Sequence, residues 1–152
     1  MQAARHVWIA RHGTLDGAKE AFMKSLSTIV PHDLTTTRER FTAALAEQGF
    51  GIRTEVDFQA TFEAKLGETH EPHVVLGICN PGYAKRALDV DRSIAVLLPC
   101  SATLRGVEGG TEVLILDPEH AFALLDDETQ EHVGDVAAEV KVRLGAALET
   151  LA

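Results

Sequence analysis

The sequence predicts an α+β domain: a single, mostly antiparallel sheet with helices packed on one face and a long C-terminal helix. Short apolar or alternating runs that end at glycine, proline or aspartate are typical of strands. Segments with apolar residues at helical spacing lie between these runs, and the longest of them ends the chain. With 152 residues, the chain is expected to form one domain over residues 21–152, preceded by an arm at residues 1–20.

Strands and helices are expected to alternate in the first half of this domain. The expected elements are a strand over 22–30, a helix over 36–48, a strand over 52–58 and a short helix over 60–66 that Gly67 ends. Thr36 and Glu39 have the spacing of a capping box, and Gly49 suits the C-cap of the same helix. In the second strand, period-two alternation predicts one half-buried face made of Ile52, Thr54, Val56 and Phe58.

The second half is expected to add further strands and two helices. The expected elements are a central strand over 73–78, a helix over 81–88, a buried strand over 94–98 that resumes over 102–105, a last strand over 111–116, and a terminal helix over 128–151. The terminal helix is expected to bury a stripe made of Val133, Val136, Val140, Leu144, Leu148 and Leu151. Asn80 is expected to cap the first of these helices, with Pro81 as its first residue. Pro99 lacks an N–H donor, so we expect a bulge or break in the strand just before Cys100. Glu108-Gly109-Gly110 indicates a hairpin turn.

Composition argues against two kinds of partner. The net charge is −9, and the basic residues are scattered, whereas phosphate binding needs clustered Lys and Arg, so no nucleic-acid partner is expected. No apolar run reaches the roughly 20 residues of a membrane span, and the N-terminus lacks the pattern of a signal peptide. We therefore expect a cytoplasmic protein whose two cysteines are free thiols.

Those two cysteines mark the candidate site. Cys79 and Cys100 each follow an apolar run interpreted as a strand, and neighbouring strands lie about 5 Å apart, so both thiols are expected to face one pocket. A helix start directly after Cys79 would favour its thiolate and offer free backbone N–H groups to an anion. The further candidate ligand-binding residues are Asn80, Pro81, Tyr83, Pro99 and Lys65.

Other motifs give little support for a cofactor. The chain contains no Cys-x-x-Cys pair, no glycine-rich phosphate loop and no Gly-x-Ser-x-Gly elbow, so the cofactor is unknown. The run His70-Glu71-Pro72-His73 contains metal-ligating residue types. Pro72 prevents the helical i, i+4 geometry of paired zinc histidines, so a metal site is not expected in this run.

Several short motifs occur in the order found in a known family. They are Glu47-Gln48-Gly49-Phe50-Gly51, Glu55-Val56-Asp57, Thr61 to Gly67, Gly77-Ile78-Cys79-Asn80-Pro81-x-x-Ala84, Leu97-Leu98-Pro99-Cys100 and Asp117-Pro118. Through these motifs the chain resembles domain-of-unknown-function family 302 over roughly residues 22–118, and the resemblance is expected to extend over the terminal helix. The resemblance implies a compact α+β domain, often found as a homodimer, and no established activity. Residues 1–20 have no counterpart in it.

Three functions remain open at this point. The first is a homodimeric binding domain in which Cys79 and Cys100 hold a soft metal ion, a sulfur species or a small anion. The second is a thiol enzyme with Cys79 as nucleophile or redox thiol and Cys100 as its resolving partner. The third is a structural homodimer or protein-interaction module whose cysteines only fill the core. Sulfur atoms that meet in an open cavity favour the first two, and separated or buried sulfur atoms favour the third.

Overall fold

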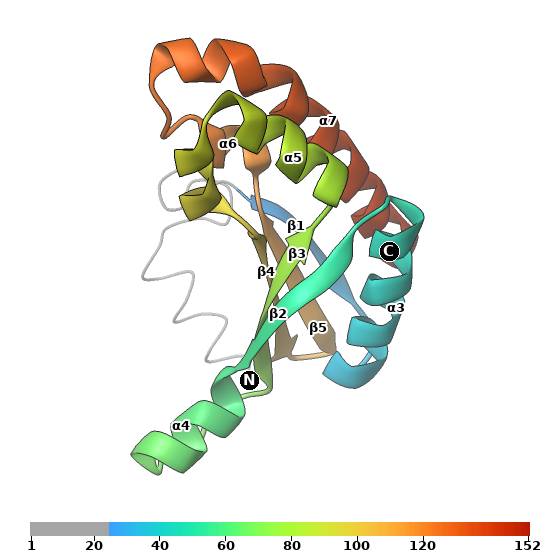
Figure 1. Cartoon of the computed structure of the whole chain (residues 1–152). Coiled ribbons are helices and arrows are strands. Elements are labelled where there is room, and N and C mark those ends of the chain that lie inside the picture. The colour runs from blue at the N-terminus through green and yellow to red at the C-terminus, as the bar shows by residue number, and fades with distance from the viewer. Residues whose placement is uncertain (1–24) are drawn as a thin grey trace, which may run out of the picture.

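The structure is a computed structural model that describes residues 25–152 (Figure 1). The expected arm over residues 1–20 and the expected start of the first strand at Phe22 lie outside the described residues. The described elements, in chain order, are β1 (Ser25–Val30), α3 (Leu34–Glu47), β2 (Gly51–Asp57), α4 (Phe58–Leu66), β3 (His73–Cys79), α5 (Pro81–Val90), the 3₁₀ helix η1 (Arg92–Leu97), β4 (Cys100–Val107), β5 (Gly110–Leu116), α6 (Pro118–Phe122) and α7 (Asp127–Leu151).

These strands form one antiparallel sheet of five strands in the order β1-β5-β4-β3-β2. Figure 1 shows α3, α5, α6 and α7 on one side of the sheet, whereas α4 projects beyond one end of it. The long helix α7 packs against α3, α5 and α6. The predicted fold class is therefore confirmed. In the described part of the chain, every helix is too short or too polar to cross a membrane.

Alternate strand residues build the core on the helix-covered face. The fully buried strand residues are Leu76, Ile78, Leu104, Val113 and Ile115, and the helix residues that are equally buried include Phe41, Leu45, Val133 and Leu144. The predicted apolar stripe of the terminal helix is confirmed, because all six of its residues are buried: Val133, Val136, Val140, Leu144, Leu148 and Leu151. No described helix covers the opposite side of the sheet, which is called the open face below.

Local capping signals explain most helix boundaries. Asn80 caps α5 and Pro81 begins it, as predicted. Gly67 ends α4 in the left-handed conformation (φ 64°) that glycine adopts at little cost. The predicted capping box is wrong: Asp33 caps α3, because its carboxylate accepts a hydrogen bond from the Thr36 N–H at 2.7 Å. The helix therefore begins earlier than the expected start at residue 36.

The strand expected over 94–98 is wrong, because residues 92–97 form the 3₁₀ helix η1. The Asp91 carboxylate accepts a hydrogen bond from the Ser93 N–H at 2.7 Å and so starts this helix. Only Ile94 of the apolar run is fully buried, while Val96 is 88% exposed. Pro99 therefore lies in the connection before β4 rather than within a strand, and the expected break in a ladder at Pro99 is not formed.

A β-bulge instead interrupts β2. Ile52 pairs with Ile78 of β3, but Thr54 pairs with Gly77, so one extra residue stands between the two pairs. The predicted single face of the second strand is consequently wrong: Ile52 lies on the helix-covered face, whereas Thr54 and Val56 lie on the open face. The shift also turns Glu55 to the helix side, where its carboxylate pairs with Arg38 of α3 at 2.6 Å.

Candidate functional site

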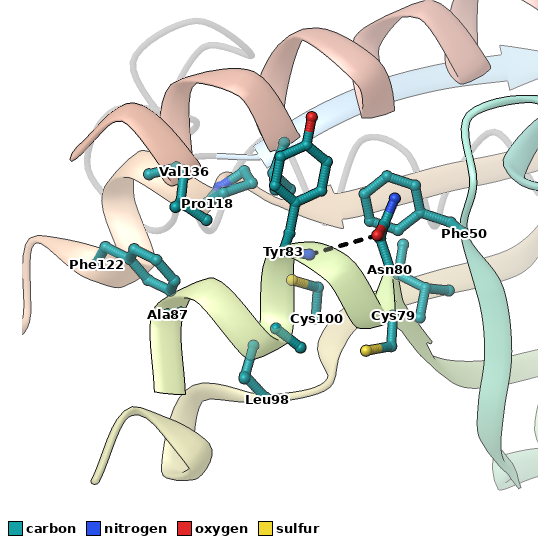
Figure 2. A pocket seen from close by; sticks show the side chains of 14 residues that line it. Phe50, Cys79, Asn80, Tyr83, Ala87, Leu98, Cys100, Pro118, Phe122 and Val136 are labelled. Carbon is teal, nitrogen blue, oxygen red and sulfur yellow. Dashed lines mark hydrogen bonds between the residues drawn. The ribbon is translucent and has the colours of Figure 1, made fainter. Parts of the chain in front are cut away.

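The expected site lies where β3 ends and β4 begins, underneath α5. Since the two strands are antiparallel, Cys79, the last residue of β3, and Cys100, the first residue of β4, are brought to the same edge of the sheet. A cavity of about 30 Å³ lies here (Figure 2). Its lining consists of Phe50, Ile78, Cys79, Asn80, Tyr83, Ala84, Ala87, Leu98, Cys100, Pro118, Phe122, Val136, Ala137 and Val140.

Cys100 is a half-buried thiol that packs against the core and is protonated at neutral pH. Burial, with a smaller contribution from the neighbouring Cys79, raises the pKa of Cys100 to about 11. The thiolate is the form that attacks electrophiles, and almost none of it is present at pH 7 with such a pKa. Cys100 therefore behaves at neutral pH as a small apolar side chain with a weak S–H donor.

The two cysteine side chains leave the sheet on opposite faces. Cys100 pairs with Ile78, so it shares the helix-covered face with Ile78, and Cys79, one residue later, points to the open face. Figure 2 shows the same arrangement: the sulfur of Cys100 is directed towards α5, and the sulfur of Cys79 is directed away from it. Both are free cysteines. Side chains that diverge in this way cannot form a disulfide without backbone movement.

The start of α5 has no free donors for an anion. Its first residue, Pro81, has no N–H, and the Asn80 side-chain oxygen accepts the N–H groups of Gly82 and Tyr83 at 3.0 and 3.4 Å. The next N–H, from Ala84, donates to the Asn80 carbonyl at 3.0 Å. Asn80 thus acts as the helix cap, and it occupies the place where an anion would bind.

Tyr83 lines the cavity with its ring and directs its hydroxyl elsewhere. The hydroxyl accepts a hydrogen bond from the Arg143 Nε at 2.7 Å, which ties α5 to α7. The guanidinium groups of Arg86 and Arg143 lie 5.4 and 5.6 Å from the centre of the ring. Figure 2 shows the hydroxyl directed away from Cys79 and Cys100.

Three predicted site residues do not line this cavity. Pro81 only begins α5. Pro99 packs against the open-face side of Gly77, where an added Cβ would lie 2.6 Å from its Cγ atom. Lys65 lies in the last turn of α4, the helix that projects beyond one end of the sheet (Figure 1). Of the predicted residues, the structure brings together Cys79, Asn80, Tyr83 and Cys100.

Much of the cavity wall comes from residues that were not assigned to the site from sequence. Phe122 belongs to the short helix α6, which was not predicted, and Val136 and Val140 belong to the stripe of α7. Phe50 follows α3 and packs its ring into the same space. The apolar character of these residues predicts that they pack inside the protein. It does not predict that they lie near Cys100.

Comparisons with known proteins place the chain in a family. The model of the family described as "Domain of unknown function DUF302" matches residues 26–151. A crystal structure of an uncharacterized conserved DUF302 protein from Bacillus stearothermophilus is similar, with a TM-score of 0.78 and 25% sequence identity over 86% of this chain and 99% of that chain. No protein with a curated description matches this chain. Since the family model covers nearly all of the described residues, the chain belongs to the DUF302 family.

Proposed function

We propose that this domain is a self-associating interaction module whose binding surface is the open face of the sheet. The strand register assigns to this face Ser25, Ser27, Ile29, Gly51, Thr54, Val56, His73, Val75, Gly77, Cys79, Ser101, Thr103, Arg105, Val107, Gly110, Glu112, Leu114 and Leu116. Arg105 and Glu112 are the only residues of this set with a permanent charge, and they pair with each other at 3.0 Å. The near absence of net charge on this face is the observation that carries the proposal.

A sheet face with almost no net charge is unusual when that face is exposed to water. An antiparallel sheet with one face in water normally carries polar and charged residues on that face. Here Ile29 and Val56 are 53% and 46% exposed, and apart from Glu112, Arg105 and His73 the strands between them present uncharged residues on this face. Depletion of charged residues is typical of the centre of protein interfaces.

The distribution of charge favours a second copy of the chain as the partner that binds the open face. The net charge of −9 makes most surfaces of two copies repel each other. The open face escapes this repulsion, because its one cationic and its one anionic side chain already neutralise each other. A twofold interface uses the same patch on both partners, which a neutral face of short side chains permits.

Sedimentation of the full chain tests this proposal. We expect a dimer whose dissociation constant rises at least tenfold in Val56→Lys and in Ile29→Lys, because each places a charge on the face. Val96→Lys is the matched control, because Val96 is an exposed valine in η1 that does not belong to the open face. A monomeric wild-type chain, or a dimer that weakens equally in all three variants, would overturn the proposal.

A second candidate function is supported by the cavity around Cys100. Apart from Cys79 and Cys100, the ionisable group in its lining is Tyr83, whose hydroxyl points away. A volume of about 30 Å³ holds only one or two water-sized groups. We infer that a ligand here is a very small, soft species, such as hydrogen sulfide or a single Cu⁺ ion. A small anion is disfavoured, because the donors at the start of α5 are already used.

Protection of each thiol tests the second candidate. Alkylation of Cys100 in the folded protein should slow at least tenfold in sodium sulfide or in a Cu⁺ complex, and Cys79→Ala should behave like the wild type. Equal alkylation rates with and without both probes would reject ligand binding in the cavity. Rapid alkylation of Cys79 with a midpoint well below pH 8 would instead favour the thiol enzyme.

A further inference from the structure

We propose that His70 and His73, assisted by Glu71, bind a divalent transition-metal ion such as Zn²⁺ at the corner between α4 and β3. This corner lies at the opposite end of β3 from the cysteines, where His73 also belongs to the open face, and the inference goes beyond the proposed function. Candidate ligand atoms of the three residues all lie within 4.8 Å of one another. The sequence argument against a site here assumed a helix, but His70 lies in the loop after α4 and His73 begins β3.

The separation of the two ring nitrogens suits a metal. The Nε2 atom of His70 lies 3.1 Å from the Nδ1 atom of His73. Two nitrogen ligands at 2.0–2.1 Å from a tetrahedral Zn²⁺ lie roughly 3.3 Å apart. Replacing the proton between the rings by a metal ion therefore changes the separation of the two nitrogens by a few tenths of an ångström, and the rings must rotate so that both lone pairs point at the ion.

Glu71 is placed to support the site from the second shell of ligands. Its carboxylate lies 3.6 Å from the Nδ1 atom of His70, the ring nitrogen that does not face His73. A metal-bound histidine usually donates its other N–H to a carboxylate or carbonyl, which fixes the ring. When Nε2 of His70 takes the metal, Nδ1 must carry the proton, and the Glu71 carboxylate faces this nitrogen from just beyond hydrogen-bond distance.

The protein holds both rings in place before any metal arrives. Phe62 of α4 contacts the His70 ring edge-on at 5.0 Å between ring centres, and Phe58 contacts the His73 ring at 5.6 Å. The Gln59 side chain donates to the His70 carbonyl at 3.0 Å and anchors the loop. A fixed first shell reduces the ordering cost of binding.

Access and local charge also permit a cation. The side chains of His70 and Glu71 are 25% and 43% exposed, so an ion can enter from solvent. Among the described residues, one cation, Arg105, lies nearby, 3.6 Å from Glu71, but it is also paired with Glu112 at 3.0 Å. These two carboxylates and one guanidinium give the described part of the corner a net negative charge when the histidines are neutral.

Cobalt(II) titration of the full chain is the test, with visible absorption as the readout. We expect a ligand-field spectrum without a thiolate charge-transfer band. Binding should be lost in His70→Ala and in His73→Ala, and it should weaken about tenfold in Glu71→Gln, as is common for such supporting carboxylates. His120→Ala is the matched control and should bind like the wild type, because His120 is an exposed histidine of α6.

A readout in the unmodified chain guards against variants that fail to fold. Zn²⁺ should shift the side-chain ¹H–¹⁵N signals of His70 and His73 and leave those of His120 and His132 in place. It should also raise the melting temperature of the wild type, because a ligand of the native state stabilises it. No binding by the wild type, unchanged binding in both His70→Ala and His73→Ala, or shifts confined to other histidines would each show a hydrogen-bonded histidine pair only.

Discussion

Ile78 and Cys100 stand opposite each other in the ladder between β3 and β4, and this pairing decides what the two thiols can do. It assigns Cys100 to the core side and Cys79 to the open face, with the sheet between them. If β4 were shifted by one residue along β3, so that Cys100 paired with Cys79, both sulfur atoms would point to the same side of the sheet. The divergence of the two side chains therefore favours the interaction module over a thiol enzyme.

The half-buried Cys100 thiol should make the domain less stable at alkaline pH. Its pKa is raised to about 11 in the folded chain, whereas an unfolded cysteine ionises near pH 8.5. The unfolded chain loses this proton first, so the stabilisation is complete below about pH 8.5 and is lost as the pH rises towards 11, by about 3 kcal/mol. Urea denaturation of wild type and Cys100→Ala should show a stability difference that narrows from pH 8 to pH 10.5. A constant difference would contradict the burial of this thiol.

Asn80 should matter to stability as a cap. Asn80→Ala removes the acceptor of two N–H groups at the start of α5 and should lower the free energy of unfolding by about 1 kcal/mol. Asn80→Asp keeps an acceptor of similar shape and should retain most of that stability. Equal losses in both variants would point instead to the amide contact between Asn80 and the Gln48 carbonyl at 3.5 Å.

Two glycines should respond to alanine in opposite directions. A Cβ at Gly77 would lie 2.2 Å from the Thr54 hydroxyl and 2.6 Å from Pro99, so Gly77→Ala should cost about 1–3 kcal/mol. A Cβ at Gly134, on the exposed side of α7, meets nothing within 4 Å, so Gly134→Ala should stabilise the helix by about 0.5–1 kcal/mol. Thermal melting of the two variants is the measurement, and a tolerated Gly77→Ala would show that the neighbouring side chains can move aside.

Asp117 should contribute to the acid limb of the stability curve. Burial opposes its ionisation, but hydrogen bonds from Lys141, at 2.9 Å, and from the Glu119 N–H outweigh it and hold the pKa of Asp117 below its ordinary value. The stabilisation is therefore present above about pH 4 and is lost as the pH falls through the lowered pKa. Asp117→Asn keeps a cap for α6 but loses the ion pair. It should cost about 1–2 kcal/mol at pH 7 and little near pH 2, as measured by urea denaturation.

The parts of the fold that sequence predicted correctly depend on short-range signals. Asn80-Pro81, Gly67 and the stripe of α7 act within one or two turns of a helix, and each was located within a few residues. The hairpin at Glu108-Gly109-Gly110 is confirmed by the pairing of Val107 with Gly110. Such signals act between residues that are close in the chain, so they can be recognised without knowing the rest of the fold.

The incorrect predictions concern features that depend on contacts between residues far apart in the chain. The apolar run 94–98 suited a strand, but the Asp91 cap and the single core contact of Ile94 turned it into η1. The bulge in β2 appears in its pairing with β3, and the alternation of apolar and polar residues within β2 alone gives no information about that pairing. The approach of His70 to His73 likewise depends on packing against α4. The two cysteines lie at one edge of the sheet, as their positions at strand ends suggested, but the direction of each sulfur depended on register.

Strand β3 begins at His73 and ends at Cys79, so the histidine corner and the cysteine edge lie at opposite ends of the same strand. Six steps of about 3.4 Å separate those residues by roughly 20 Å. An occupant of one end can therefore never touch an occupant of the other, and they could influence each other only if the whole strand shifts. The distance along β3 can be measured directly, because a nitroxide on Cys79 and a paramagnetic ion bound between the histidines would form a spin pair across the strand.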